Sequence, residues 1–599
     1  MITKNIPTGN QMISLPNIDE TTAGIYDFTF LHMGYKGLID VRGDETTPLI
    51  QPFIEIDNKK VAFKSLVWNR LSNWIPNFTL ETDTIKLSAT ILAPIDERGF
   101  LVNLRITNCS DNTLKVNYGL SGRWASSLHC VNEDKVIQSK KYCYESPWND
   151  SIVFDMRGPM PIFSFAPITD KKCITKFSDS CDSVDYSLTR FEELKPDEDC
   201  ELTVYWGVGF EEVAAATSAK EMLRQGYEKE LTKTLDWLNE RSLMLRDKNL
   251  TRLYNTNLFF CIFFSTGITL DTEEFVSVTS RSPRYYVSAA YWDRDSLLWS
   301  FPAILDADKN LAHDMLMYVY DRQRKNFGVH SRYIDGTVLE PGFELDELMA
   351  PVIALERYVD TTGDISILEE NNIRKGIEEI LSKLKNHRHK DVALYETFLQ
   401  PTDDMHVYRY ITYDNMLVWK SLLAIAHLYP KYKDLEFTAG EVKEAILKHC
   451  VKEENGKLCF AWSVDLQGHY DIYDEPPGSL QLFPYYGFCK ADDEIYENTV
   501  NIIRSPEYKY SFADSRCSEI GCPHAPHPWI LSVANSLLCG RSKHCYDFLK
   551  NVKMDNYIAC ESVDEDTGEC TTGAAFATCA GLLCHSIKEA KEGLDKIYE

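Results

Sequence analysis

The sequence changes its periodicity once, near residue 210, and this change decides the class of fold. Before it, segments such as "FLVNLRITNCSDNTLKVNYGL" alternate apolar and polar residues and are separated by short polar turns. This pattern is typical of antiparallel strands joined by turns. After it, beginning with "AAATSAKEMLRQGYEKELTKTLDWL", apolar residues recur at helical spacing almost to the C-terminus. The pattern therefore predicts an α+β multidomain protein whose β part comes first.

Three segments follow from these patterns. We expect residues 1–212 to form an antiparallel β-sandwich, residues 213–245 a helical linker, and residues 246–599 a helical domain. The helical domain contains about twelve candidate helices, and helices paired in hairpins around one core favour an (α/α)6 toroid. A chain of 599 residues is also too long for one ordinary core, which favours two large domains.

The charge of the chain excludes several classes of partner. A formal net charge of −27 and a pI near 5.0 would repel nucleic acid and anionic membranes, which bind clustered Lys and Arg. The N-terminal stretch "MITKNIPTGNQMISLPNIDE" lacks the apolar core of a signal peptide, and the apolar runs are shorter than a membrane span. We therefore expect a cytoplasmic protein with an uncharged partner, which binds neither nucleic acid nor membrane.

The cysteines indicate neither disulfides nor a metal site. They number 18 in a long chain, and many lie inside apolar runs, which is typical of reduced, buried thiols. No CxxC occurs, and Cys560, Cys570, Cys579 and Cys584 lack the paired spacing of zinc ligands. We predict no metal and no cofactor.

Aromatic and acidic residues cluster in loops of the helical part, as in sugar-binding crevices. Aromatic rings stack on the apolar face of a pyranose, while Asp, Asn, Arg and His bind its hydroxyls. In "YYVSAAYWDRDSLLWSFPAI", Asp293 and Asp295 flank Arg294, next to Trp292. A guanidinium between two carboxylates can hold a sugar hydroxyl while its charge stays compensated. The structural alternative is an N-cap or a simple ion pair.

The stretch "QPTDD" carries two adjacent aspartates, Asp403 and Asp404. Adjacent side chains point in different directions, so both cannot face one substrate atom. One is expected to be a general acid and the other a hydroxyl ligand or cap, because a nearby carboxylate in a partly dry pocket raises the pKa of an acid. We favour Asp403 as the acid, since Pro401 and Thr402 restrict its backbone. The alternative is that the pair caps the helix expected from Thr412.

Glu561 is the third candidate. It follows the apolar "YIAC" and precedes an acidic turn that contains glycine. A single loop glutamate is usually solvated, but its position directly after apolar residues favours burial and a shifted pKa.

Six motifs in order then resemble one family. The segments "YWDRDS", "FELDELMAPVIALERYVDTTGD", "QPTDD", "VDLQGHYDIYDEPPGSLQLFPYYGF", "IGCPHAPHPW" and "ACES" are similar to the successive motifs of glycoside hydrolase family 125, the metal-independent exo-α-mannosidases. The resemblance extends from residue 285 to residue 580. It implies an (α/α)6 barrel that cleaves terminal α-mannosides, typically 1,6-linked, with inversion and without a metal.

The resemblance also implies roles for individual residues. The general acid would come from Asp403 and Asp404, and the general base would be Glu561. The sugar-holding residues would be Arg294, Asp295, Glu344, Asp346 and His524, beside Trp292 and Asp293.

The chain departs from the family pattern in three places. Gln400 stands where family members have Arg, Cys560 stands where they have His before the base, and the long β part is additional.

A β-sandwich before such a barrel is similar to glucoamylases, debranching α-glucosidases and sugar phosphorylases. An α-glucosidase and a phosphorylase are therefore alternatives, although a carboxylate at position 561 would repel phosphate. A binding scaffold without activity, or an epimerase with His330, His406 or His524 as bases, is a further alternative.

Overall fold

The computed structural model describes residues 4–179 and 183–598 and contains two compact units. The first unit comprises Met1–Ser242, Thr266–Val276 and Arg281–Ala289. The second comprises Leu243–Ser265, Ser277–Ser280 and Ala290–Glu599. Among the described residues, no helix combines the length and the apolar character that crossing a membrane requires.

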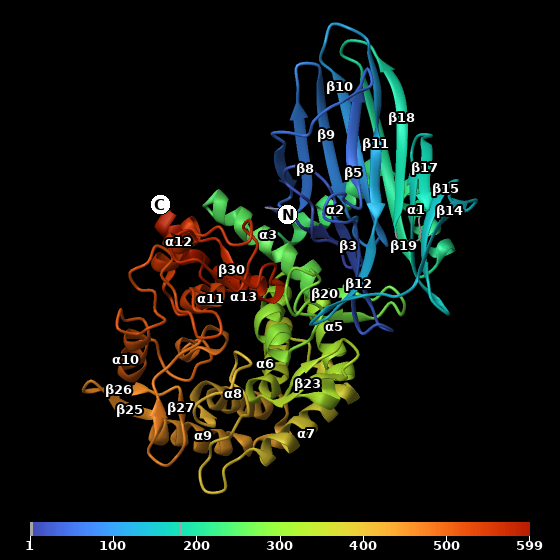
Figure 1. The fold of residues 1–599 in the computed structure, drawn as a ribbon. Coiled ribbons are helices and arrows are strands. Elements are labelled where there is room, and N and C mark those ends of the chain that lie inside the picture. The colour runs from blue at the N-terminus through green and yellow to red at the C-terminus, as the bar shows by residue number, and fades with distance from the viewer. Residues whose placement is uncertain (1–3, 180–182, 599) are drawn as a thin grey trace. The chain divides into compact units, whose positions relative to one another are not determined.

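Antiparallel sheets build the first unit (Figure 1). The largest sheet has the order β14 (Lys140–Ser146), β15 (Ser151–Arg157), β16 (Pro161–Thr169), β19 (Asp199–Gly209), β10 (Gly99–Asn108), β9 (Ile85–Leu92), β8 (Ile75–Glu81) and β7 (Val67–Leu71). The second has the order β17 (Ile174–Asp179), β18 (Val184–Leu194), β11 (Leu114–Trp124), β5 (Gln51–Ile56) and β6 (Lys59–Lys60). The third has the order β1 (Thr8–Gly9), β2 (Ser14–Leu15), β3 (Asp27–His32), β4 (Gly37–Arg42), β12 (Ser126–Cys130) and β13 (Asp134–Val136).

Aromatic side chains fill the core of this unit. The rings of Phe154 and Phe165 stack with centroids 4.4 Å apart, and Trp124 meets Phe165 edge-on at 5.4 Å. Such offset and edge-on pairs add to the free energy of apolar burial. The alternation of buried and less buried residues along β11 is the pattern that a half-buried strand requires.

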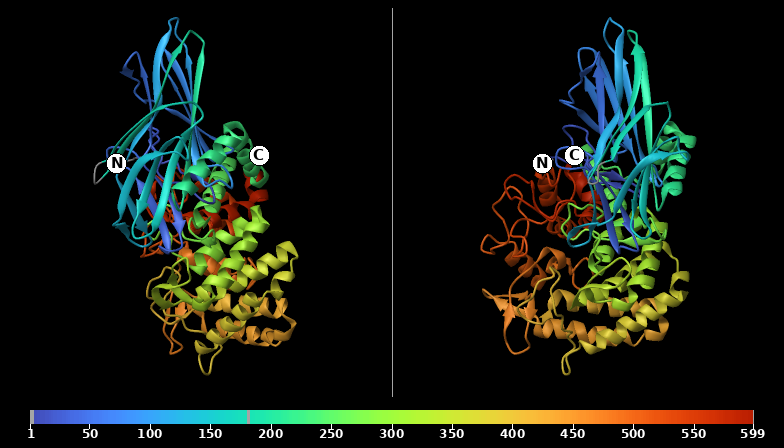
Figure 2. Two further views of the ribbon diagram at one scale, coloured as in Figure 1. Left: turned by 90° about the vertical axis from the view of Figure 1, so that its right-hand side faces the viewer. Right: turned by 45° about the vertical axis from the view of Figure 1, so that its right-hand side comes forward.

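Two helices continue the first unit, namely α1 (Glu212–Gln225) and α2 (Tyr227–Arg241), within the segment predicted as a linker. Helix α1 lies on β16 and β19 (Figure 2). Two glycines of β19 permit this approach, since a Cβ at Gly207 would come 2.1 Å from the carbonyl oxygen of Ala215. At Gly209 it would come 2.5 Å from the nitrogen of Ala215. No other residue fits at such distances.

The second unit is mainly helical, and its helices follow one another around it in Figure 1. They are α3 (Lys248–Ser265), η1 (Arg294–Ser300), α4 (Phe301–Ala307), α5 (Lys309–Tyr318), α6 (Leu345–Thr362), α7 (Asn371–Asn386), α8 (Thr412–Leu428), α9 (Leu435–His449), α10 (Glu494–Ile503), α11 (Ile530–Leu538), α12 (Ser542–Asn551), α13 (Ala577–Glu589) and α14 (Lys591–Tyr598).

An inner ring of elements closes this unit. Helix α13 contacts η1, η1 contacts α6, and α6 contacts α8, while α11 contacts α13 on the other side. Short 3-10 turns, η6 (Pro476–Gly478) and η7 (Leu480–Leu482), fill the position between α8 and α11. Gly478 lies against α8, because a Cβ there would come 2.7 Å from the ring of Tyr413. The predicted fold class, a β-sandwich followed by an (α/α)6 toroid, is confirmed.

Candidate active site

A buried guanidinium joins three of the predicted motifs. Arg294 opens η1, and its side chain is only 1% exposed. Its Nε donates to Asp346 at 2.6 Å, its Nη1 donates to Asp403 at 3.0 Å, and its Nη2 donates to Glu344. Glu344 and Asp346 lie at the start of α6, whereas Asp403 lies on the loop before α8. The segments "YWDRDS", "FELDE" and "PTDD" therefore converge on one cation.

Glu347 and Arg332 complete the network on its inner side. The Glu347 carboxylate accepts the backbone N–H of Arg294 at 3.0 Å and that of Asp293, so it holds the first turn of η1. Arg332, on β22 (Val329–Arg332), donates to the Asp293 carboxylate, which also accepts the hydroxyl of Tyr291 at 2.7 Å. The Asp293 side chain makes no capping bond to its helix, so its function is ion pairing.

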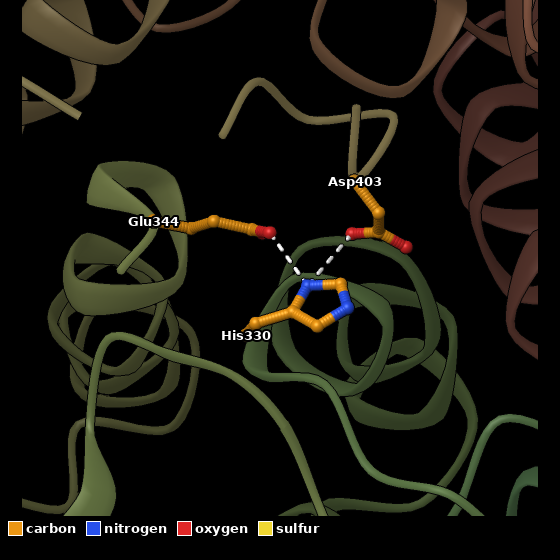
Figure 3. Close-up of side chains that lie close together, drawn as sticks. All are labelled: His330, Glu344 and Asp403. Carbon is orange, nitrogen blue, oxygen red and sulfur yellow. Dashed lines mark hydrogen bonds and ion pairs between the residues drawn. The ribbon is translucent and has the colours of Figure 1, made fainter. Parts of the chain in front are cut away.

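His330 bridges two carboxylates of the network (Figure 3). Its Nδ1 lies 2.7 Å from Oε1 of Glu344 and 3.5 Å from Oδ1 of Asp403. Burial lowers the pKa of His330, but the bond to Glu344 and the charge of Asp403 outweigh this and raise the pKa to about 9. His330 is therefore an imidazolium at neutral pH. The ring of Trp292 packs edge-on against it at 5.6 Å, and the Trp292 N–H finds no acceptor among the described residues.

Buried carboxyl groups outnumber the cations of this network. Burial raises the pKa values of Asp295 and Glu344 to about 7, against the opposing charge of Arg294. Burial also raises the pKa values of Glu347 and Asp414 far above their ordinary range. Neither oxygen of Asp414, on α8, has a hydrogen-bond partner in the described part of the chain. Several of these groups therefore hold protons at neutral pH. The buried acids are Asp293, Asp295, Glu344, Asp346, Glu347, Asp414 and Glu475, and the cations are Arg294, Arg332 and His330.

The aspartate pair lies at the exposed edge of this network. The Asp403 side chain is 34% exposed and its backbone is left-handed, with φ of 65°. The Asp404 side chain is 49% exposed, and its Oδ2 lies 3.0 Å from Nδ1 of His524. Helix α8 has Ile411 at its N-cap and no side-chain cap, so neither aspartate caps it. The two carboxyls point to different partners, as expected for adjacent residues.

Glu561 is buried, with 2% exposure, directly before the short strand β29 (Ser562–Val563). Thr572, on β30 (Cys570–Thr572), donates its hydroxyl to Oε1 of Glu561 at 3.2 Å. Gly573 is required beside it, because a Cβ there would come 2.5 Å from the Glu561 Cβ. Asp295 lies at the N-terminal end of α13, where the hydroxyl of Thr578 donates to it at 2.9 Å. Burial raises the pKa of the Cys579 thiol, and the carboxyls of Glu561 and Asp295 add to this rise.

The structure therefore brings together Trp292, Asp293, Arg294, Asp295, Glu344, Asp346 and Asp403, with Asp404 and His524 paired beside them. The sequence reasoning did not single out Arg332, Glu347, Asp414 and Glu475, and it considered His330 only as an epimerase base. Glu347 and Glu475 lie within motifs already quoted, but spacing alone does not show which acid of a motif is buried.

The imidazolium of His330 predicts a pH-dependent stability. Its folded pKa of about 9 exceeds its ordinary value of 6.5, so its stabilising contribution is complete below about pH 6.5 and lost as the pH rises through about 9. From the size of this shift, the wild type should lose about 3 kcal/mol relative to His330→Gln across that range. Urea denaturation at each pH measures the difference, with the exposed His427→Gln as control. A pH-independent difference would contradict the assignment.

Comparisons with known proteins find glycosidases. Residues 386–588 match the sequence model of the metal-independent α-mannosidases, glycoside hydrolase family 125. A Streptococcus pneumoniae structure from a family of metal-independent α-mannosidases, in a non-productive complex with α-1,6-mannobiose, is 20% identical, covers 60% of this chain and 97% of its own, and has a TM-score of 0.53. A bacterial glucoamylase complexed with acarbose is 12% identical, with 99% and 95% covered and a TM-score of 0.65.

No curated protein matches the chain in sequence. The two solved structures share its fold, and the glucoamylase shares it over nearly the whole length. The family match confirms, over residues 386–588, the resemblance to glycoside hydrolase family 125 that the motifs predicted, and the chain is a glycoside hydrolase.

Proposed function

We propose that the chain is an exo-acting, inverting α-mannosidase that removes terminal 1,6-linked mannose from oligosaccharides without a metal. The observation that carries this proposal is the convergence of Arg294, His330 and Asp403 within a unit whose residues 386–588 match the α-mannosidase family. The linkage follows the α-1,6-mannobiose bound by the similar structure. A cytoplasmic location remains part of the proposal.

The excess of buried acid suits the chemistry of glycoside cleavage. The transition state has oxocarbenium character, so positive charge develops on the sugar, and preorganised carboxylates stabilise it. Asp403 lies at the solvent-accessible edge of this network, where its carboxyl would donate a proton to the glycosidic oxygen. Glu561 would take a proton from the attacking water, which inverts the anomeric centre.

The remaining predicted residues are proposed to shape the sugar site. Asp293, Arg294, Glu344 and Asp346 are buried and would form its charged floor. The side chain of His524 is 30% exposed and would lie at its rim with Asp404. The unsatisfied N–H of Trp292 could donate to a sugar hydroxyl.

An α-glucosidase of the glucoamylase type is the second candidate. It is favoured by the similarity in fold to the bacterial glucoamylase, which extends over 99% of this chain and so includes the first unit. A phosphorylase is disfavoured, because the buried Glu561 would repel phosphate.

A substrate screen tests the proposal directly. The purified full chain is expected to hydrolyse aryl α-mannosides and α-1,6-mannobiose, with no requirement for phosphate and with β-mannose as the first product by proton NMR. Turnover of α-glucosides alone would establish the second candidate. A requirement for phosphate would establish a phosphorylase, and α-mannose as first product would exclude inversion.

Glu561→Gln should remove the base without changing the shape of the site. The expected loss in kcat is about 10²- to 10⁴-fold, the usual contribution of a general base, with mannose binding retained by calorimetry. Glu569→Gln is the matched control, because Glu569 lies in the same segment and its side chain is 62% exposed. Near-normal turnover of Glu561→Gln would remove Glu561 from the mechanism.

Two substrates with different leaving groups distinguish the roles of Asp403 and Asp404. Asp403→Asn should reduce cleavage of α-1,6-mannobiose by about 10²- to 10⁴-fold, yet largely spare a dinitrophenyl α-mannoside, whose leaving group needs little protonation. Asp404→Asn should affect both substrates alike. If Asp404→Asn alone shows the selective loss, the roles are reversed. If neither variant does, the acid lies elsewhere.

A further inference from the structure

A fully buried carboxyl group lies behind the loop that carries the aspartate pair. Glu475 is 0% exposed and directly precedes the 3-10 turn η6. Its Oε1 accepts the backbone N–H of Thr402 at 2.9 Å, and its Oε2 accepts the Thr402 hydroxyl at 3.0 Å. The hydroxyl of Tyr473 donates to the same Oε2 at 3.2 Å. The two oxygens of Glu475 thus hold the residue next to Asp403 at both its backbone and its side chain.

The rest of the loop is closed on itself around Thr402. The N–H of Gln400 donates to the carbonyl of Asp404 at 3.0 Å, and the N–H of Asp403 donates to the carbonyl of Gln400 at 2.8 Å. The Gln400 amide donates to the Thr402 hydroxyl at 3.1 Å and accepts the Trp462 N–H at 3.2 Å. Asp403 is therefore the left-handed residue of a tight turn whose preceding residue is fixed from behind.

A buried glutamate at position 475 destabilises the fold unless its hydrogen bonds offset the loss of hydration. Burying a carboxyl costs free energy, and the surroundings of Glu475 raise its pKa far above the ordinary range, chiefly through burial. Within the described chain, its hydrogen bonds go to Thr402 and Tyr473, with no cation among these partners. These hydrogen bonds fix the orientation of the loop that carries Thr402 and Asp403.

We propose that Glu475 is the positioning residue for the general acid, acting through Thr402 on the carboxyl of Asp403. The inference rests on the proposed function, in which the aspartate pair supplies the acid. Proton transfer to a glycosidic oxygen requires hydrogen-bond geometry, and a displacement of about 1 Å can cost about 10²-fold in rate. Loss of the anchor should therefore harm the substrates that need an acid and spare those that do not.

The test compares variants of the full chain on α-1,6-mannobiose and on a dinitrophenyl α-mannoside. Glu475→Met keeps the length of the side chain but removes both acceptors, and should lower kcat/KM for mannobiose by about 10²-fold. Its kcat/KM for the activated mannoside should stay within about threefold of wild type. Glu475→Gln should restore mannobiose turnover, because its amide can accept from the Thr402 N–H and donate to the Thr402 hydroxyl.

Glu519→Met is the control for the loss of a buried carboxyl as such. Glu519 is also 0% exposed and in the same unit, but it binds Arg504, Ser532 and His544. This variant should lose thermal stability without any preference between the two substrates. If Glu475→Met does not fold, Thr402→Val against Thr402→Ser is the second comparison. Only the valine variant lacks the hydroxyl, and it should show the same preference for the activated substrate.

Two results would overturn the inference. One is an equal loss on both substrates, or no loss, in Glu475→Met and in Thr402→Val. The other is a Glu475→Gln variant as defective on mannobiose as Glu475→Met, which would remove the hydrogen-bond basis. A failure of the acid assignment is separate, since it appears as an absence of leaving-group dependence in both Asp403→Asn and Asp404→Asn.

Discussion

The guanidinium of Arg294 is the counter-charge on which the second unit depends. It lies in the interior and bonds to carboxylates that come from two places, the start of α6 and the loop before α8. A buried ion without partners costs several kcal/mol, so these segments are held at their distances by electrostatics as well as by apolar packing. Glu347, which fixes the first turn of η1, sets the position of the guanidinium itself. The orientation of Asp403 is thus linked, through one side chain, to the inner ring of helices.

The acidity of the site is the second consequence of this arrangement. Burial raises the pKa values of Asp295, Glu344 and Asp414, and the charge of Arg294 does not offset this rise, so these groups retain protons more readily than they would in water. The carboxyl groups that remain ionised disfavour an anion in the site and favour a developing positive charge, as cleavage of a glycoside requires.

The sequence predicted the parts of the fold that depend on local periodicity. The alternation along β11 and the apolar spacing of α8 were read correctly, and α8 begins at Thr412 as expected. Periodicity did not show that α13 begins at Ala577, because β30 and the left-handed residues Gly573 and Ala575 precede it. Local pattern also could not show that short 3-10 turns replace a full helix in the inner ring, since the contacts of Gly478 are distant in sequence.

The candidate residues of the site were recognised because they are polar residues next to aromatic, basic or apolar residues in the sequence. The sequence does not show which of them are buried. Nothing in "YDEPPGS" distinguishes the carboxyl of Glu475 from a solvated one, and nothing in "ITYDN" shows that Asp414 lacks a partner among the described residues. These roles depend on which segments meet in space, and only the three-dimensional structure shows this.

The contact between Gly573 and Glu561 limits how this protein can vary. Gly573 has φ of 58°, and the space where its side chain would begin is already filled by the Cβ and Oε2 of Glu561. A side chain at position 573 would clash with Glu561. Homologous proteins that keep the glutamate are therefore expected to keep the glycine as well. The exposed Asp566 at the tip of the same hairpin carries no such restriction, whereas Gly568 does, because a Cβ there would come 3.0 Å from the carbonyl oxygen of Asn551. In an alignment of descendants, we expect Glu561 and Gly573, which lie twelve positions apart in this chain, to be retained together.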